Sequence, residues 1–223
     1  MEQIILNVAL WAVPVVLAIT LHEAAHGYVA RMFGDPTAYE QGRITLNPLK
    51  HIDPVGTVLL PGAIVLMNAF TGAQFPPFGW AKPVPVNFGR LRRPKQDMLW
   101  VAAAGPASNF VQAVLWMLVA SLFVPTPVEG AGATTLAVLC SRGLAANLVL
   151  MLINLIPIPP LDGGRIMVSL LPVKAAWQLS RVEPYGFFIL IALLYSDVLN
   201  KPLQLAMEGV AQFIFLITGA PGA

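Results

Sequence analysis

The sequence is poor in charged residues and in cysteine. Of its 223 residues, 11% are charged and 57% are hydrophobic, whereas about 25% of the residues in a typical soluble domain are charged. This composition excludes an ordinary soluble domain and predicts an all-α polytopic membrane protein. The single cysteine, Cys140, excludes an internal disulfide. The net charge of +2 gives no reason to expect a nucleic-acid partner.

Long apolar runs are present instead, and they predict about five to six transmembrane helices within one domain, residues 1–223. A run of 18 or more apolar residues is typical of a membrane span. The last two runs look like a helical hairpin about Asn200-Lys201-Pro202. The expected spans are residues 4–33, 98–124, 135–156, 185–199 and 203–218.

Basic residues predict the orientation in the membrane. If the first span ends in the cytoplasm, 11 of the 13 lysines and arginines fall on the cytoplasmic side, and only Arg142 and Lys201 fall outside. Cytoplasmic loops are normally enriched in these residues. The count requires residues 55–78 to enter the membrane and return to the same side, as a re-entrant or double-pass segment. We therefore expect a multi-pass protein of a prokaryotic cell membrane, with its site towards the cytoplasm.

Two short polar segments predict small β-hairpin elements at the cytoplasmic face. Residues 43–46 are a short strand candidate, and residues 82–86 alternate in a way that allows an edge-like extended segment. Either segment could pair with an unwound substrate, or both could form an ordinary interfacial hairpin.

The most informative motif, His22-Glu23-Ala24-Ala25-His26, lies within the first apolar run. Helical residues four apart share a face, so both imidazoles can bind one metal ion. Glu23 can accept a proton from a metal-bound water. Singly, each histidine could be a satisfied polar residue, and the glutamate could pair with a cation. Because three such residues together in a membrane are costly unless they have a function, we interpret the motif as a metal site.

A catalytic zinc normally has three protein ligands, so one more must come from another segment. Asp162 is the best candidate. A helix counted from Gly143 reaches only ~21 Å by Pro157, short of the ~30 Å hydrocarbon core. The prolines that follow force an extended path, which places Asp162 at membrane depth. Gly163 and Gly164 would let the backbone approach the metal. The alternative is a loop aspartate without a metal role.

Three further residues have open roles. His51 either contacts the site or its substrate, or is an ordinary loop histidine. Asp53, before Pro54, is expected to cap a helix. Asn109 either bonds within the site or links two helices, and the small residues of segment 102–108 suit close packing against Ala24, Ala25 and Gly27.

Taken together, these motifs resemble those of the site-2 protease family, the intramembrane zinc metalloproteases. The resemblance is to the compact bacterial and archaeal branch, without a PDZ or CBS domain. It implies His22, His26 and Asp162 as ligands of one Zn²⁺ per chain, Glu23 as general base, and Asn154 as a stabiliser of the oxyanion. The matching motifs are His22 to His26, Gly105-Pro106-Ala107-Ser108-Asn109, Asn154, and Leu161-Asp162-Gly163.

We therefore hypothesise an intramembrane zinc metalloprotease that hydrolyses a peptide bond within or near a transmembrane helix of another membrane protein. The alternatives are a metal-binding membrane transporter and a catalytically inactive membrane chaperone. A transporter is expected to contain repeat-related broken helices, and none is evident in the sequence. Metal binding alone would not need a base at Glu23.

Overall fold

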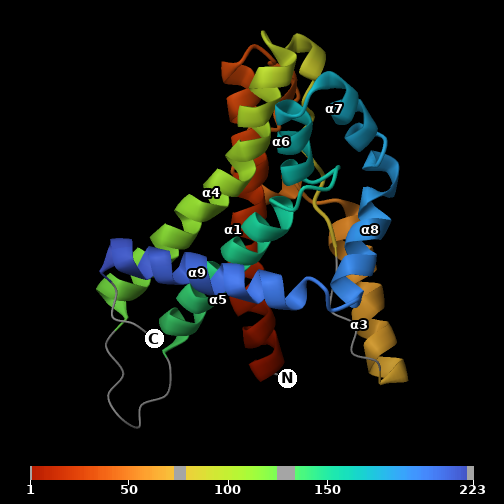
Figure 1. The fold of residues 1–223 in the computed structure, drawn as a ribbon. Helices are drawn as coiled ribbons and strands as arrows, with labels where there is room; N and C mark the ends of the chain where they lie inside the picture. Colours follow the sequence, from red (N-terminus) through yellow and green to blue (C-terminus); the bar gives the residue numbers. More distant parts are fainter. Residues whose placement is uncertain (1, 73–78, 125–133, 220–223) are drawn as a thin grey trace.

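The computed structural model describes residues 2–72, 79–124 and 134–219, and every regular element in these ranges is a helix (Figure 1). Three helices are long, namely α1 (Glu2–Met32), α4 (Pro94–Phe123) and α5 (Thr135–Asn154). The prediction of an all-α protein is confirmed. The shorter elements are α2 (Thr37–Glu40), η1 (Pro48–Lys50), η2 (Pro54–Leu59), α3 (Leu60–Thr71), η3 (Phe88–Arg90), α6 (Asp162–Leu170), α7 (Val173–Ser180), α8 (Glu183–Tyr195) and α9 (Asn200–Thr218).

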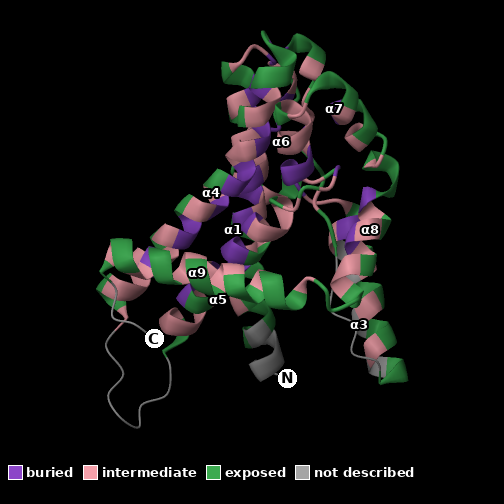
Figure 2. Ribbon diagram, viewed as in Figure 1, coloured by how far each residue is buried: buried purple, intermediate pink, exposed green. Residues whose placement is uncertain are grey.

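The three long helices pack against one another, and α6 packs against α4. Buried residues concentrate along these contacts, whereas the outer faces of the helices are exposed (Figure 2). An apolar cluster joins α4 and α5 to α9 through Met117, Met151 and Ile214, which is fully buried. The arrangement leaves a junction of α1, α4 and α5 in which several polar side chains are buried.

Three helices of the described part are long and apolar enough to cross a membrane: Val8–Met32, Pro94–Phe123 and Thr135–Asn154. The pair α8 and α9 passes the same test only when taken together, which gives up to four candidate spans. These are fewer than the five to six that the sequence predicts, but they agree with a multi-pass membrane protein. Part of the expected re-entrant segment, residues 73–78, lies outside the described residues.

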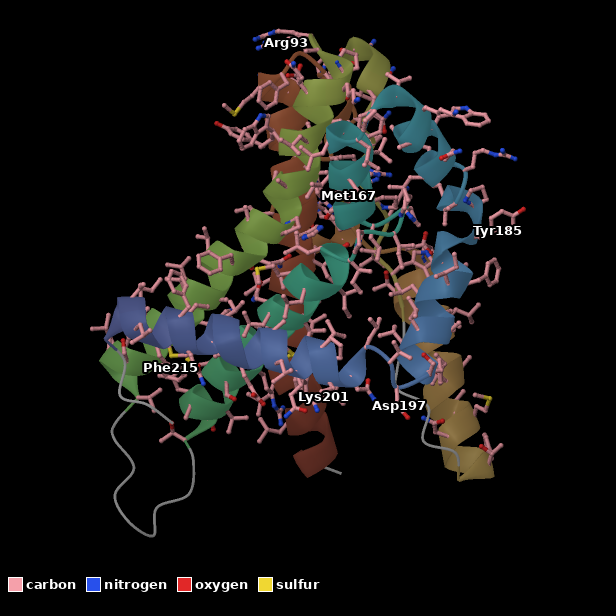
Figure 3. All side chains as sticks on the ribbon, viewed as in Figure 1. Arg93, Met167, Tyr185, Asp197, Lys201 and Phe215 are labelled. Atoms are coloured by element: carbon pink, nitrogen blue, oxygen red, sulfur yellow. The ribbon has the colours of Figure 1, made fainter. Side chains whose placement is uncertain are left out.

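The last two helices do not form the predicted hairpin. An angle of 87° separates α8 from α9. Asp197 has a φ of 58°, in the left-handed region, and such a residue ends a helix. Its carboxylate accepts a hydrogen bond of 2.5 Å from the Asn200 side chain, at the first residue of α9. Figure 3 shows Asp197 and Lys201 at this corner, with Phe215 near the other end of α9. The turn geometry therefore directs α9 across the bundle.

The predicted β-hairpin is also wrong, because neither residues 43–46 nor residues 82–86 form a strand. The second segment is extended but irregular. Pro83 and Pro85 have no N–H to donate to a sheet. The Arg43 guanidinium instead donates to the carbonyls of Lys82 and Pro83, at 2.8 and 3.3 Å. Side-chain bonds thus replace the ladder of a sheet.

Candidate metal centre

Side chains from α1 and α6 converge on one point. Nε2 of His22 lies 3.1 Å from Nε2 of His26, one helical turn further along α1. Oδ2 of Asp162 lies 3.2 Å from the first of these atoms and 3.4 Å from the second. The side chains are 8%, 12% and 8% exposed for His22, His26 and Asp162. The sequence prediction that these three residues meet is confirmed, and they form a group that can hold a metal ion.

The bonds behind the two imidazoles show what this group requires. Nδ1 of His26 lies 2.7 Å from the Val101 carbonyl, and Nδ1 of His22 lies 2.6 Å from Oδ1 of Asn109. Carbonyl and amide oxygens only accept hydrogen bonds, so each neutral ring carries its proton on Nδ1. Both Nε2 atoms are then acceptors, facing a carboxylate oxygen that is buried without a hydrogen-bond partner. Three acceptors that face one another in this way are suited to holding a cation between them.

The spacing of these atoms fits zinc. Nitrogen and oxygen ligands about 2.0–2.2 Å from a tetrahedral zinc lie about 3.3–3.6 Å apart. The observed separations of 3.1 to 3.4 Å are close to that edge length. Two imidazoles and one carboxylate form a known ligand set for catalytic zinc, which keeps the fourth position for water or substrate. The residues present therefore fit a single catalytic zinc.

Helix α4 closes one side of the centre through Gly105. A Cβ atom there would lie 2.5 Å from atoms of both His22 and His26, closer than real Cβ contacts allow. The expectation that the small residues of α4 pack closely on Ala24, Ala25 and Gly27 of α1 is met only in part here, because Gly105 contacts α1 at His22 and His26. It is wrong for Gly27, whose missing side chain would meet Ala38, Ile44 and Val84 instead.

Backbone packing brings Asp162 into the centre. After α5 ends, the chain passes through a proline-rich loop, and α6 begins at Asp162. A side chain on Gly163 would overlap the Leu155 backbone, and one on Gly164 would overlap the backbone of Pro159. From the other side, Gly186 of α8 touches the Pro159 carbonyl so closely that no Cβ fits. Because these three glycines have no side chains, α6 and α8 can pack directly against the backbone of the loop.

Glu23 lies beside the ligands on α1, and the extended segment before η3 holds its carboxylate. The backbone N–H of Val84 donates to Oε2 of Glu23, at 2.7 Å. Val84 itself is buried. The N–H of Lys82 donates to the His51 carbonyl, at 2.9 Å. These bonds tie the segment to Glu23 and to the loop at His51.

Comparisons with known proteins agree with this centre. A family model described as Peptidase family M50 matches residues 131–196, which include Asp162. YwhC of Bacillus subtilis is 39% identical over 188 residues, covering 83% of this chain and 80% of its own. The chain belongs to peptidase family M50. Rip2 of Mycolicibacterium smegmatis is 32% identical over 197 residues, 88% of this chain and 69% of its own. Both relatives are named, provisionally, as zinc metalloproteases. No solved structure matches significantly.

Membership of family M50 makes the His-His-Asp group the metal site of a zinc metalloprotease. Asn154 is the last residue of α5, and its amide donates to the Leu150 carbonyl at 2.9 Å. It therefore stands at the helix end from which the loop to Asp162 departs. Its role in catalysis stays a prediction.

Two loop residues of this M50 peptidase have structural roles. Asp53 accepts hydrogen bonds from the N–H groups of Val55 and Gly56, at 3.0 and 2.7 Å, and so caps η2 as expected. His51 is buried, and its Nε2 lies 3.1 Å from the Thr45 carbonyl. Its Nδ1 is buried without a hydrogen-bond partner among the described residues, and its contact with the site or its substrate stays a prediction.

Sequence reasoning missed two polar groups of the M50 centre. One is the Val84 N–H, because a backbone donor in a proline-rich segment has no side-chain signal. The other is Asn147 of α5, whose Oδ1 accepts from Nδ2 of Asn109 at 2.9 Å. A buried asparagine at a helix junction was a usable signal, but its partner depends on how the helices pack. Asn109 itself, left between two roles, performs both.

Proposed function

We propose that this protein hydrolyses a peptide bond within or near a transmembrane helix of another membrane protein. The observation that supports the proposal is the position of the metal group on α1. His22 and His26 belong to the candidate span Val8–Met32. Apolar side chains on the same helix, among them Trp11 and Leu17, are exposed, as suits a helix in contact with lipid.

The residues of this chain supply binding and proton transfer. When bound, zinc lowers the pKa of its water to about 7 and polarises a carbonyl. Glu23 takes a proton from the attacking water and returns it to the leaving amine. The Val84 N–H, 2.7 Å from Oε2, orients that carboxylate. Glu23 is therefore the general base in this proposal.

Asn154 is proposed to stabilise the oxyanion that forms at the scissile carbonyl. Its amide has two N–H groups, one of which donates to Leu150, so the other can face a substrate at the end of α5. Losing one such donor typically costs about 10²–10³ in rate.

We also propose the arrangement that this function requires. The chain forms one membrane-embedded domain, the segment from η2 through α3 is re-entrant, and the centre faces the cytoplasm of a prokaryotic cell. The distribution of lysine and arginine supports this orientation. Substrates would be membrane proteins, because a centre on a lipid-facing helix is reached from within the bilayer.

The test is a cleavage assay on the full chain, purified with zinc and reconstituted into liposomes with a single-span reporter. Glu23→Gln should keep one zinc per chain and lose cleavage of the reporter. Glu40→Gln, an exposed glutamate in the salt bridge to Arg90, should match the wild type. Unchanged cleavage by Glu23→Gln would refute the base. Cleavage of a soluble unfolded peptide but not of the spanning reporter would refute the membrane substrate.

A further inference from the structure

Asn109 and Asn147 form a polar chain that runs from α5 through α4 to His22. Nδ1 of His22 lies 2.6 Å from Oδ1 of Asn109, and Nδ2 of Asn109 donates to Oδ1 of Asn147 at 2.9 Å. Nδ2 of Asn147 donates in turn to the carbonyl of Gly143, at 2.9 Å. Both asparagines are 0% exposed. Burial of two amides is costly unless each is hydrogen-bonded, so each amide must keep its partners in the folded protein.

The two metal-binding histidines differ in how their tautomers are fixed. The Val101 carbonyl can only accept, so it fixes the proton of His26 on Nδ1 without help. An asparagine amide can turn either its oxygen or its nitrogen towards a ring. If Asn109 presented its NH₂ group, His22 would have to accept on Nδ1 and carry its proton on Nε2. That proton would occupy the side of the ring where the metal binds.

Two backbone carbonyls set the direction of the chain. Because the carbonyl of Gly143 only accepts, Asn147 must give it Nδ2 and present Oδ1 to Asn109. The Ala18 carbonyl, 3.3 Å from Nδ2 of Asn109, favours the same orientation. Oδ1 of Asn109 is thereby left for the N–H of His22. The direction of the two amides, set by carbonyls of α5 and α1, determines which nitrogen of His22 is free.

We propose that Asn147 and Asn109 are positioning residues that hold His22 in the tautomer that binds zinc, with Asn147 acting through Asn109. His26 does not depend on them. The proposal concerns metal binding alone, so it does not depend on which peptide bond the enzyme hydrolyses.

The first test is the zinc affinity of the full chain in detergent, measured by competition with a chelator. Removal of a partner that orients a metal ligand typically costs about 10–100-fold in metal affinity. Asn147→Leu should cause a loss of this size. The matched control is Gln112→Leu, which removes another buried amide from the same junction, one that contacts Ser108 and the Ala18 carbonyl but not Asn109. It should keep the wild-type affinity.

A double variant separates orientation from packing. In Asn109→Asp both side-chain oxygens are acceptors, so His22 keeps an acceptor whichever way the group turns. In that background, Asn147→Leu should not lower zinc affinity further. An equal loss in both backgrounds would overturn the proposal, as would an unchanged affinity of the single variant. Asn147→Ala, which removes only the amide, replaces the leucine variant if the latter does not fold.

Nitrogen NMR gives a readout that a packing defect would not produce. The chain has three histidines, so selective ¹⁵N labelling gives few signals. Without zinc, Asn147→Leu should shift His22 towards the Nε2–H tautomer and leave His26 as Nδ1–H. Equal changes at both rings, or none at His22, would contradict the relay.

Discussion

The two elements that supply the ligands are built in different ways. On α1, a helix of 31 residues, the histidines are one turn apart on a regular backbone, and buried polar groups of α4 hold their rings. Asp162 instead begins α6, a helix of nine residues, after a proline-rich loop. Its position depends on the absence of side chains at Gly163, Gly164 and Gly186.

Because of this difference, substitutions on the two sides should affect zinc binding and folding differently. On the α1 side, hydrogen bonds orient atoms that regular helix geometry has already placed, so a change there should weaken zinc binding more than folding. On the α6 side, close backbone contact places the ligand itself. A side chain introduced there must move a loop or a helix, so stability and zinc should be lost together.

The largest effect is expected on the α6 side, from Gly186→Ala. The new Cβ would overlap the Pro159 carbonyl oxygen, and the backbone on both sides is packed. Overpacking typically costs about 1–3 kcal/mol, occasionally more, and this contact should lie at or above that range. The midpoint temperature of thermal unfolding and the zinc content should both fall.

The control for this variant is Gly209→Ala in α9, where a Cβ meets nothing within 4 Å. Alanine is favoured over glycine inside a helix by about 0.8–1.0 kcal/mol, so this variant should be at least as stable as the wild type. If Gly186→Ala keeps both its stability and its zinc, the close packing of α8 on the loop does not place Asp162.

A smaller, more selective effect is expected on the α1 side, from Gly105→Ala. Its Cβ would press on both imidazoles at 2.5 Å, so the rings must shift relative to Asp162. Zinc affinity should fall about 10–100-fold, while the helical circular dichroism signal remains. Loss of the fold in parallel with zinc would remove the distinction between the two sides.

The smallest effect is expected where no metal ligand is touched, at Val84. Val84→Pro removes the N–H that donates to Glu23. Val84→Ala keeps that N–H and changes only the side chain, which takes no part in the bond. A hydrogen bond to a charged group contributes about 1.5–3 kcal/mol, so cleavage should fall at least about tenfold in the proline variant. Zinc content should stay at the wild-type level in both. Equal cleavage by the two variants would contradict a role for the N–H.

Much of the centre could be predicted because its ligands follow local rules. The spacing of His22 and His26 depends only on the helix repeat. Asp162 was predicted from a short helix counted from Gly143, but α5 begins at Thr135 and has 20 residues, so that helix length was wrong although Asp162 does meet the histidines. Both predictions rest on distances along a single element. The membrane character could be predicted from composition alone, without any contact between distant segments.

The parts that could not be predicted depend on contacts between distant segments. The direction of the Asn109 amide depends on Asn147, 38 residues further along the chain, and on the Ala18 carbonyl of α1. The bend between α8 and α9 depends on a left-handed Asp197, which the sequence around Pro202 did not indicate. The extended segment was expected to pair as a strand, but Arg43 bonds its carbonyls instead.

The central claim is that α1 and α6 together hold one zinc ion, and X-ray absorption at the zinc edge of the loaded full chain tests it most directly. The expected result is one zinc per chain with two imidazole nitrogens and a carboxylate oxygen, and loss of that spectrum in Asp162→Ala. A sulfur ligand, or a spectrum that Asp162→Ala leaves unchanged, would contradict the claim.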